Sequence, residues 1–365
     1  MKNIKHSYIL YIVCMFLFPF FSLAQPGTLD IRFGEQGKIF ENDYRAAADV
    51  IAVQKDDKII AAGNFYSGVG LHVSRYNNDG SLDESFAEEG RFILRDLEGY
   101  GIGTTTNMLV QKDGKILIGA RSILSAANQD ISLIRLNTDG SLDNSFGGNG
   151  IVDLAIGPYD DEIGEMALQE DGKIIVAGLR DVGDWRNYDN EEPFILRLNT
   201  DGSHDARFGE NGIVIQNFNG VYVRINALIV LPNGKMIMGG EDDGYYDTQV
   251  AMFKYNADGS LDTSFGNKGI VESRFPKDQY GRDIIAYIHD FLLLPSGKIF
   301  IVGMDNSYKM FLSKFTSAGF PDTSFGINKG YKTMNNFVSN RYGKQAHLVK
   351  GNKIIIAGSG LTAYR

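Results

Sequence analysis

Acidic and basic side chains recur at matching places along the chain and could form a repeated binding site. An Asp stands before an x-Ser-Phe or related segment in each of six units, and a basic residue ends an apolar segment ahead of five of them. Charges repeated at strand ends more often satisfy structure than bind ligands, so we predict ion pairs within each unit or caps on backbone N–H groups. The acids are Asp30, Asp83, Asp143, Asp205, Asp262 and Asp322, and the basic residues are Arg75, Arg135, Arg197, Lys254 and Lys314.

The segment Asn-x-Asp-Gly-Ser-x-Asp overlaps the spacing of a calcium loop, as at 77–83 and 137–143. An EF-hand loop needs an acidic first ligand and a bidentate Glu at its twelfth position. Aligned on Asp79 and Gly80, those two positions hold Arg75 and Phe86. The pattern therefore indicates a tight turn, and we expect neither a metal nor a cofactor.

Catalytic constellations are scarce. The histidines beyond the first 24 residues (His72, His204, His289 and His347) have no H-x-x-H or HExxH spacing, and Cys14 is the single cysteine. No GxSxG segment or Walker loop is present. Acids are plentiful, so a carboxylate pair acting on a glycoside remains an open alternative, although the sequence gives no separation between the carboxyl groups.

The elements that must position these residues repeat with a period of about 60 residues. One segment resembles Gly-Ser-Leu-Asp-x-Ser-Phe-Gly, and another resembles Asp-Gly-Lys-Ile-Ile-Val-Ala-Gly, as at 171–178. Each unit reads as four short strands bounded by Gly, Asp and Asn, and the Asp-Gly pairs at 169–173 and 256–260 predict tight hairpins with a left-handed Gly. The repeated Phe, which we expect between neighbouring units, is Phe33, Phe86, Phe146, Phe208, Phe265 and Phe325.

Repeated units of four antiparallel strands favour an all-β, six-bladed β-propeller over an open solenoid, which would need polar capping units. Residues 27–40 read as a lone fourth strand, and the last unit ends within its third strand. We therefore predict that the N-terminal strand closes the ring, and that residues 25–365 form a single domain.

The pairing of QxDGKIIVAG with RYNxDGSLDxSFGxxG resembles the delta-60 repeat family, an exported bacterial group similar to β-propellers. The resemblance covers about residues 26–365 and implies a propeller that often lacks a defined activity. Departures from the pattern are local: Ala87 follows Phe86 where Gly is expected, and His204 replaces Leu.

The connections between the second and third strands, and between successive units, are longer and must share the face opposite the tight turns. These loops carry aromatic residues beside acids, which suits sugar stacking or protein contact, although the aromatics could equally pack onto the disc. The candidate binding residues are Trp185, Tyr188, Tyr245, Tyr246, Asp242 and Asp243.

The first 24 residues read as a signal peptide, because Lys2 and Lys5 precede an apolar run that ends in Ser22-Leu23-Ala24. We expect export to the periplasm, cell surface or medium, with no membrane span in the remaining chain. The formal net charge of -9 argues against nucleic-acid binding. The sequence thus predicts an exported binding or scaffold module for a glycan or protein; the alternative is a secreted carbohydrate-active enzyme using loop carboxylates.

Overall fold

The computed structural model describes most of the repeated part of the chain. It covers residues 29–40, 47–65, 70–95, 101–123, 129–183, 191–216, 223–242, 249–275, 285–307, 309–326, 330–334, 343–349, 353–358 and 362–364. Residues 1–24, the predicted signal peptide, lie outside this part. Every regular element within it is a β-strand, and it contains no helix long and apolar enough to cross a membrane.

The strands form five four-stranded antiparallel sheets and one three-stranded sheet, each paired in chain order. We call the four-stranded sheets blades 1 to 5 and the three-stranded one the last sheet. Blade 1 is β1 (Val50–Val53), β2 (Ile59–Asn64), β3 (Leu71–Tyr76) and β4 (Arg91–Leu94). Blade 2 is β5 (Gly101–Val110), β6 (Ile116–Ile123), β7 (Gln129–Leu136) and β8 (Ile151–Leu154). Blade 3 is β9 (Asp161–Leu168), β10 (Ile174–Asp181), β11 (Glu191–Leu198) and β12 (Ile213–Ile215).

The remaining sheets follow the same order. Blade 4 is β13 (Val223–Val230), β14 (Met236–Asp242), β15 (Gln249–Tyr255) and β16 (Ile270–Ser273). Blade 5 is β17 (Ala286–Leu293), β18 (Ile299–Asp305), β19 (Met310–Phe315) and β20 (Tyr331–Thr333). The last sheet is β21 (Gly343–Val349), β22 (Lys353–Gly358) and β23 (Thr362–Tyr364).

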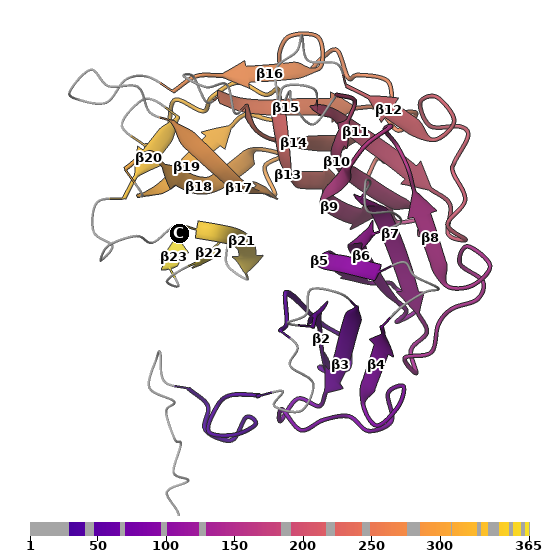
Figure 1. Ribbon diagram of the computed structural model, residues 1–365. Helices are drawn as coiled ribbons and strands as arrows, with labels where there is room; N and C mark the ends of the chain where they lie inside the picture. Colours follow the sequence, from indigo (N-terminus) through magenta and orange to yellow (C-terminus); the bar gives the residue numbers. More distant parts are fainter. Residues whose placement is uncertain are drawn as a thin grey trace, which may run out of the picture.

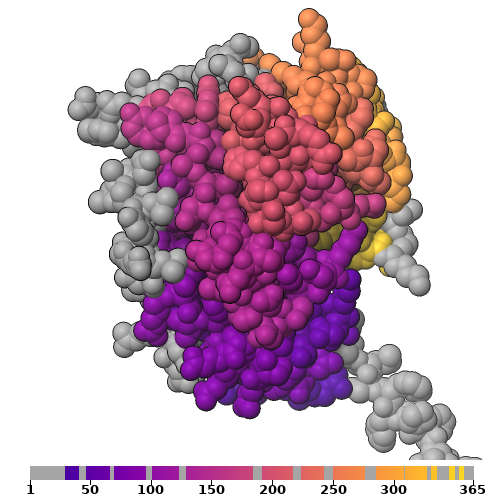
Figure 2. Space-filling view, turned by 90° about the vertical axis from the view of Figure 1, so that its right-hand side faces the viewer, coloured from indigo at the N-terminus to yellow at the C-terminus, as the bar shows by residue number. Residues whose placement is uncertain are grey.

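The sheets stand around a common axis as the blades of a β-propeller (Figure 1). The first strand of each sheet is innermost, and each inner strand contacts the next around the ring, from β1 through β5, β9, β13 and β17 to β21. From the side, consecutive blades follow one another as contiguous blocks from indigo to orange (Figure 2). The predicted all-β propeller of four-stranded antiparallel blades is confirmed for these five blades.

The hydrophobic core lies between blades, and each of blades 2 to 5 contributes to a cluster on both faces of its sheet. Ile60 and Ala62 of blade 1 pack with Ile116 and Ile118 of blade 2, and equivalent clusters fill each later interface. The repeated Phe side chains sit at these interfaces: Phe86, Phe146, Phe208 and Phe265 are fully buried, whereas Phe33 and Phe325 are half-buried.

The tight turns have the predicted geometry. Gln169 N–H donates to the Lys173 carbonyl (2.9 Å) with Gly172 at φ +83°, and Asn256 N–H donates to the Ser260 carbonyl (2.7 Å). Gly259 has φ +90°, so both turns use a left-handed glycine.

A bulge in the inner strand recurs from blade 2 to the last sheet and explains the glycine that ends the Lys-Ile-Ile-Val-Ala-Gly segment. The pairing of β9 with β10 shifts between Ala177 and Gly178. A Cβ on Gly178 would collide with the Glu162 carbonyl oxygen of the bulged strand. A Cβ on Gly303 would collide with the Tyr287 carbonyl oxygen in the same way, so the absent side chain makes room for the bulge of the inner strand.

The N-terminal segment packs against blade 1 as each blade packs against the next. Gly34 N–H donates to the Asp79 carbonyl (2.7 Å), just as Ala87 N–H donates to Asp139 (2.6 Å) one unit later. The Phe33 ring also lies against Gly80. In the described part of the chain, however, β23 has no fourth strand beside it, and residues 29–40 form no strand with the last sheet. Six blades and a closed ring therefore stay predictions.

Candidate functional site on the inner strands

Most of the predicted binding residues fall outside the described part of the chain. Trp185, Tyr188, Tyr245, Tyr246 and Asp243 are all in this group. Asp242 ends β14, where its Cα is paired with that of Val223. The strand ends that flank these residues, in β10, β11, β14 and β15, lie opposite the tight turns. We call this end the long-loop face.

The repeated acids bind cations of their own blade. Asp83 Oδ2 accepts from Lys58 Nζ (2.8 Å) and Arg75 Nε (2.6 Å). Burial alone would raise the pKa of Asp83, but the hydrogen bonds from Lys58, Ser85 and Arg75 lower it below its usual range. Comparable ion pairs hold Asp143, Asp262 and Asp322, whereas Asp30 pairs with Arg32 in the N-terminal segment. The ion pairs expected within the units are thus present.

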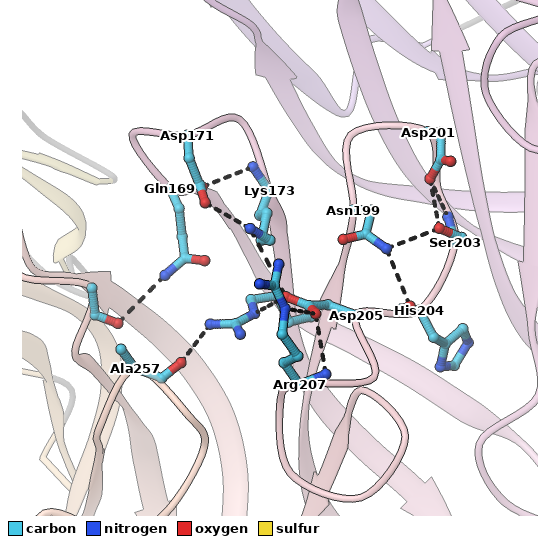
Figure 3. Close-up of polar contacts among 12 residues, drawn as sticks. Gln169, Asp171, Lys173, Asn199, Asp201, Ser203, His204, Asp205, Arg207 and Ala257 are labelled. Carbon is cyan, nitrogen blue, oxygen red and sulfur yellow. Dashed lines mark hydrogen bonds and ion pairs between the residues drawn. The ribbon is translucent and has the colours of Figure 1, made fainter.

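Blade 3 varies this arrangement, as Figure 3 shows around Asp205. Arg197 Nε donates to Asp205 Oδ2 (2.9 Å), and Arg207 lies 3.6 Å from its other oxygen. Lys173 Nζ instead pairs with Asp171 Oδ2 (2.8 Å) and lies 3.9 Å from Asp205 Oδ2. The carboxylate is still neutralised within the blade, so the repeated acids serve the scaffold.

The strand arginines also connect consecutive blades. The Arg75 guanidinium donates to the Thr138 carbonyl of blade 2 (2.6 Å) and lies 4.6 Å from the centre of the Phe86 ring. Arg135 reaches Thr200 and Arg197 reaches Ala257 in the same way. Each of these arginines thus binds an acid, an aromatic face and a backbone acceptor of the scaffold.

A different set of polar side chains lies on the inner strands and on the adjoining β14, and we call it the axial cluster: Asn107, Glu165, Asn226, Glu241 and Asp290. Glu165 of β9 and Asp290 of β17 take equivalent positions, each paired with the residue before the glycine of the neighbouring strand and each directly after the bulge. Both side chains are half-buried. The bulge therefore brings carboxyl groups of two separate blades to the same level of the ring.

Hydrogen bonds hold both carboxyl groups by one oxygen. Glu165 Oε1 accepts from the Asn107 amide (3.0 Å) and from Met166 N–H (3.0 Å). Asp290 Oδ2 accepts from Ala346 N–H of the last sheet (2.7 Å). Each carboxyl group thus also links its blade to a neighbour, which is a structural role in itself.

The protonation of these carboxyl groups differs from that of the scaffold acids. Burial, with a smaller contribution from the negative charge of Asp290, raises the pKa of Glu165 to about 7. Burial also raises the pKa of Asp290 to about 6. Two electrostatically coupled carboxyl groups near neutrality can divide the roles of proton donor and proton acceptor.

Amide and carboxylate groups continue the cluster between blades 4 and 5. The Asn226 amide donates to Glu241 Oε2 (3.0 Å) and to the Ile288 carbonyl (2.7 Å), while Ile288 N–H donates to Glu241 Oε2 (2.6 Å). Toward the long-loop face, Glu162, Arg224 and Tyr287 are exposed at equivalent positions of their inner strands. The inner wall is therefore polar and charged along this part of the ring.

Sequence reasoning missed Glu165 and Asp290, although a signal for them exists. Each lies eight residues before the repeated lysine of its unit, Lys173 or Lys298, and Asn107 stands at the same offset before Lys115. A polar residue at that offset directly precedes the three apolar residues that end the strand. Within the described ranges, no three His, Cys, Asp or Glu side chains are arranged to hold a metal ion.

Comparisons with known proteins agree with the fold. The family model "Domain of unknown function (DUF5122) beta-propeller" matches residues 54–86, 111–146, 169–208 and 231–265. No curated protein sequence matches the chain.

Solved structures match at low identity. That of polysaccharide lyase Uly1 has a TM-score of 0.50 at 10% identity, over 88% of this chain and 77% of that one. A protein of unknown function from Dyadobacter fermentans has a TM-score of 0.44 at 12% identity, over 89% and 94% of the two chains. At such identity the similarity shows the fold alone. The matched repeats support a β-propeller repeat family for this chain.

Proposed function

We propose that the protein is an exported binding module that takes a glycan or protein partner on its long-loop face, above the axial cluster. The observation that carries this proposal is the contrast between the two sets of acids. The repeated acids are neutralised inside the blades, whereas Glu165 and Asp290 stand half-buried beside amides on the inner strands. Carboxyl and amide groups together suit the many donors and acceptors of a sugar.

The loop aromatics complete the proposal. Trp185, Tyr188, Tyr245 and Tyr246 would supply flat apolar surfaces, and Asp242 and Asp243 would supply acceptors at the rim. A rigid ring of blades below such loops holds binding residues at a fixed spacing.

A glycan array and a pull-down with the purified protein test this proposal. We expect Trp185→Ala, or Tyr245→Ala with Tyr246→Ala, to reduce capture of the partner at least tenfold. Phe320→Ala is the matched control, because Phe320 is an exposed aromatic (58%) in a tight turn on the opposite face. Unchanged capture by the loop variants, or an equal loss in the control, would rule out the long-loop face.

A second candidate is a glycoside-acting enzyme, which the raised pKa values of Glu165 and Asp290 favour. In that case the two carboxyl groups, rather than loop acids, would act as proton donor and acceptor. Glu165→Gln and Asp290→Asn would then each abolish turnover of a polysaccharide while leaving its capture intact. If a panel of polysaccharides captured by the protein gave no product between about pH 5 and 8, this candidate would be eliminated.

The proposal also covers the signal peptide and the number of blades. We infer that residues 1–24 are removed on export and that residues 25–365 form one closed, six-bladed ring of the delta-60 repeat type. Support comes from Lys353, which begins β22 where Lys298 directly precedes β18, and from Asp30, which matches Asp322. In a closed ring these two would form the ion pair that Lys298 and Asp322 form in blade 5 (2.8 Å).

A further inference from the structure

An arginine without a counter-ion lies at the long-loop end of blade 2. Arg121 of β6 is partly buried, and its Nε atom is buried with no hydrogen-bond partner in the part of the chain that the structure describes. In that part no carboxylate pairs with it, whereas Arg75, Arg135 and Arg197 each bind an acid of their own blade. A buried donor without an acceptor is costly, so this guanidinium requires an acceptor from elsewhere.

The side chain of Arg121 faces blade 3. A Cβ on Gly119, two residues earlier on β6, would meet Ile163 and Met166 of β9. Residues two apart on a strand share a face, so Arg121 points toward β9 as well, one step nearer the long-loop face. Ile163 is the residue of β9 that directly precedes the bulge.

The equivalent residues of two other blades show what this position does. Six residues after the repeated lysine, blade 1 has Asn64 and blade 4 has Glu241, where blade 2 has Arg121. Asn64 Oδ1 accepts from the Thr105 N–H of blade 2 (2.6 Å), and Glu241 Oε2 accepts from the Ile288 N–H of blade 5 (2.6 Å). In both cases the donor is the backbone N–H directly before the bulge of the next inner strand.

Arg121 cannot do the same for Ile163, the equivalent residue of blade 3, because a guanidinium carries donors and no acceptor. Leu179 and Met304, at this position in blades 3 and 5, are apolar and bring no charge. By this equivalence the Ile163 N–H and the Arg121 guanidinium face each other as donor against donor. A group that accepts from both would complete the contact between blades 2 and 3.

The acids at this end of blade 3 do not supply that acceptor. Asp161, the first residue of β9, accepts from Ile156 N–H (2.6 Å) and Gly157 N–H (3.1 Å). Glu162 is exposed, and within the described ranges neither acid forms an ion pair with Arg121. The missing acceptor therefore comes from outside these groups, and a guanidinium favours one that is negatively charged.

We propose that Arg121 and the Ile163 N–H bind the carboxylate of an acidic sugar, such as a uronic acid in a glycan on the long-loop face. One carboxylate oxygen accepts from Ile163 N–H and Arg121 Nε–H, and the other accepts from a terminal guanidinium nitrogen, which is the fork that arginine offers to a planar carboxylate. The formal net charge of the chain is -9, so long-range attraction does not favour a polyanion, and the preference depends on this arginine. The inference rests on the proposed glycan-binding function and specifies the chemistry of the sugar.

Calorimetric titration with oligogalacturonate and with its methyl ester tests the site, because esterification removes the charge of the carboxyl groups. We expect the acid to bind at least about tenfold more tightly than the ester, since hydrogen bonds between charged groups are the strong ones. Arg121→Gln should remove this preference. Arg207→Gln is the matched control and should keep it, because Arg207 is an exposed arginine (83%) in the connection between β11 and β12, on the opposite face.

A second variant and a smaller probe keep the result interpretable. Arg121→Asn copies blade 1 and supplies an acceptor for Ile163 N–H, so it should lose the preference for the acid while its melting temperature is unchanged or higher. Binding of acid and ester with equal affinity overturns this inference and leaves the proposed function standing.

Galacturonate itself separates the site from the proposed function if no glycan polymer is captured. A melting temperature that rises with galacturonate at about 10 mM, and no longer rises in Arg121→Asn, then supports the carboxylate site and argues against a glycan partner on the long-loop face. A melting temperature that galacturonate leaves unchanged in that case overturns both.

Discussion

The raised pKa of Glu165 predicts that the protein loses stability between mildly acidic and mildly alkaline pH. A carboxyl pKa that rises from 4.5 to about 7 on folding means that the folded state binds the proton more tightly than the unfolded chain. Below about pH 4.5 the carboxyl group is neutral in both states and does not lower the free energy of unfolding. As the pH rises to about 7 this free energy falls, and above about 7 the loss is complete because the carboxyl group is charged in both states. The full difference corresponds to about 3 kcal/mol, of which about 2 kcal/mol falls between pH 5 and pH 8.

Urea unfolding at about pH 5 and pH 8 measures this effect. Glu165→Gln keeps an acceptor for the Asn107 amide and Met166 N–H but cannot ionise, so it should reduce the loss of unfolding free energy across this interval by about 2 kcal/mol. Asp290, whose pKa is also raised, should leave part of the loss in place. Glu162→Gln, at an exposed position of the same strand, is the control and should not change it. An unaltered pH dependence in Glu165→Gln would refute the assignment of a buried, protonated carboxyl group.

Three further predictions concern the scaffold, and urea unfolding measures each. Ring closure predicts that Lys353→Glu destabilises the protein by about 1 kcal/mol and that adding Asp30→Lys restores the loss; no recovery in the double variant would argue against the pair. Ala87 has φ +46° at a position where other units have Gly, so Ala87→Gly should raise the free energy of unfolding by about 1 kcal/mol. A destabilised Ala87→Gly variant would contradict backbone strain at this position. Asp83→Asn should cost about 3 kcal/mol because it leaves buried Arg75 without its carboxylate, whereas a loss near zero would show that the pair contributes little.

The sequence repeat is enough to predict the strands, turns and ion pairs of a blade, but not the polar contacts that its inner strand makes near the axis of the ring. Asp-Gly turns, strand lengths and the pairing of repeated acids with basic residues follow from local spacing, because the interacting groups lie in the same unit. Asp83, for example, meets Lys58 and Arg75 within a single blade.

The axial cluster could not be predicted in this way, because its contacts form between strands and between units. Glu165 receives a hydrogen bond from Asn107 in the preceding blade and feels the charge of Asp290 two blades further on. A single sequence does not give the radius at which the inner strands approach one another.

The contact between blades has a direction. In blades 1 to 3 an arginine donates to a carbonyl of the following unit, so each blade presents a donor on one side and an acceptor on the other. Such a head-to-tail contact does not by itself limit the number of blades, just as the contact between monomers of a linear polymer does not limit its length. A duplicated repeat inserted between blades 2 and 3 would bring both halves of the contact with it, and only a small change in the angle between blades would be needed to seat it. The scaffold is therefore suited to gaining or losing whole blades through recombination of its own coding repeats.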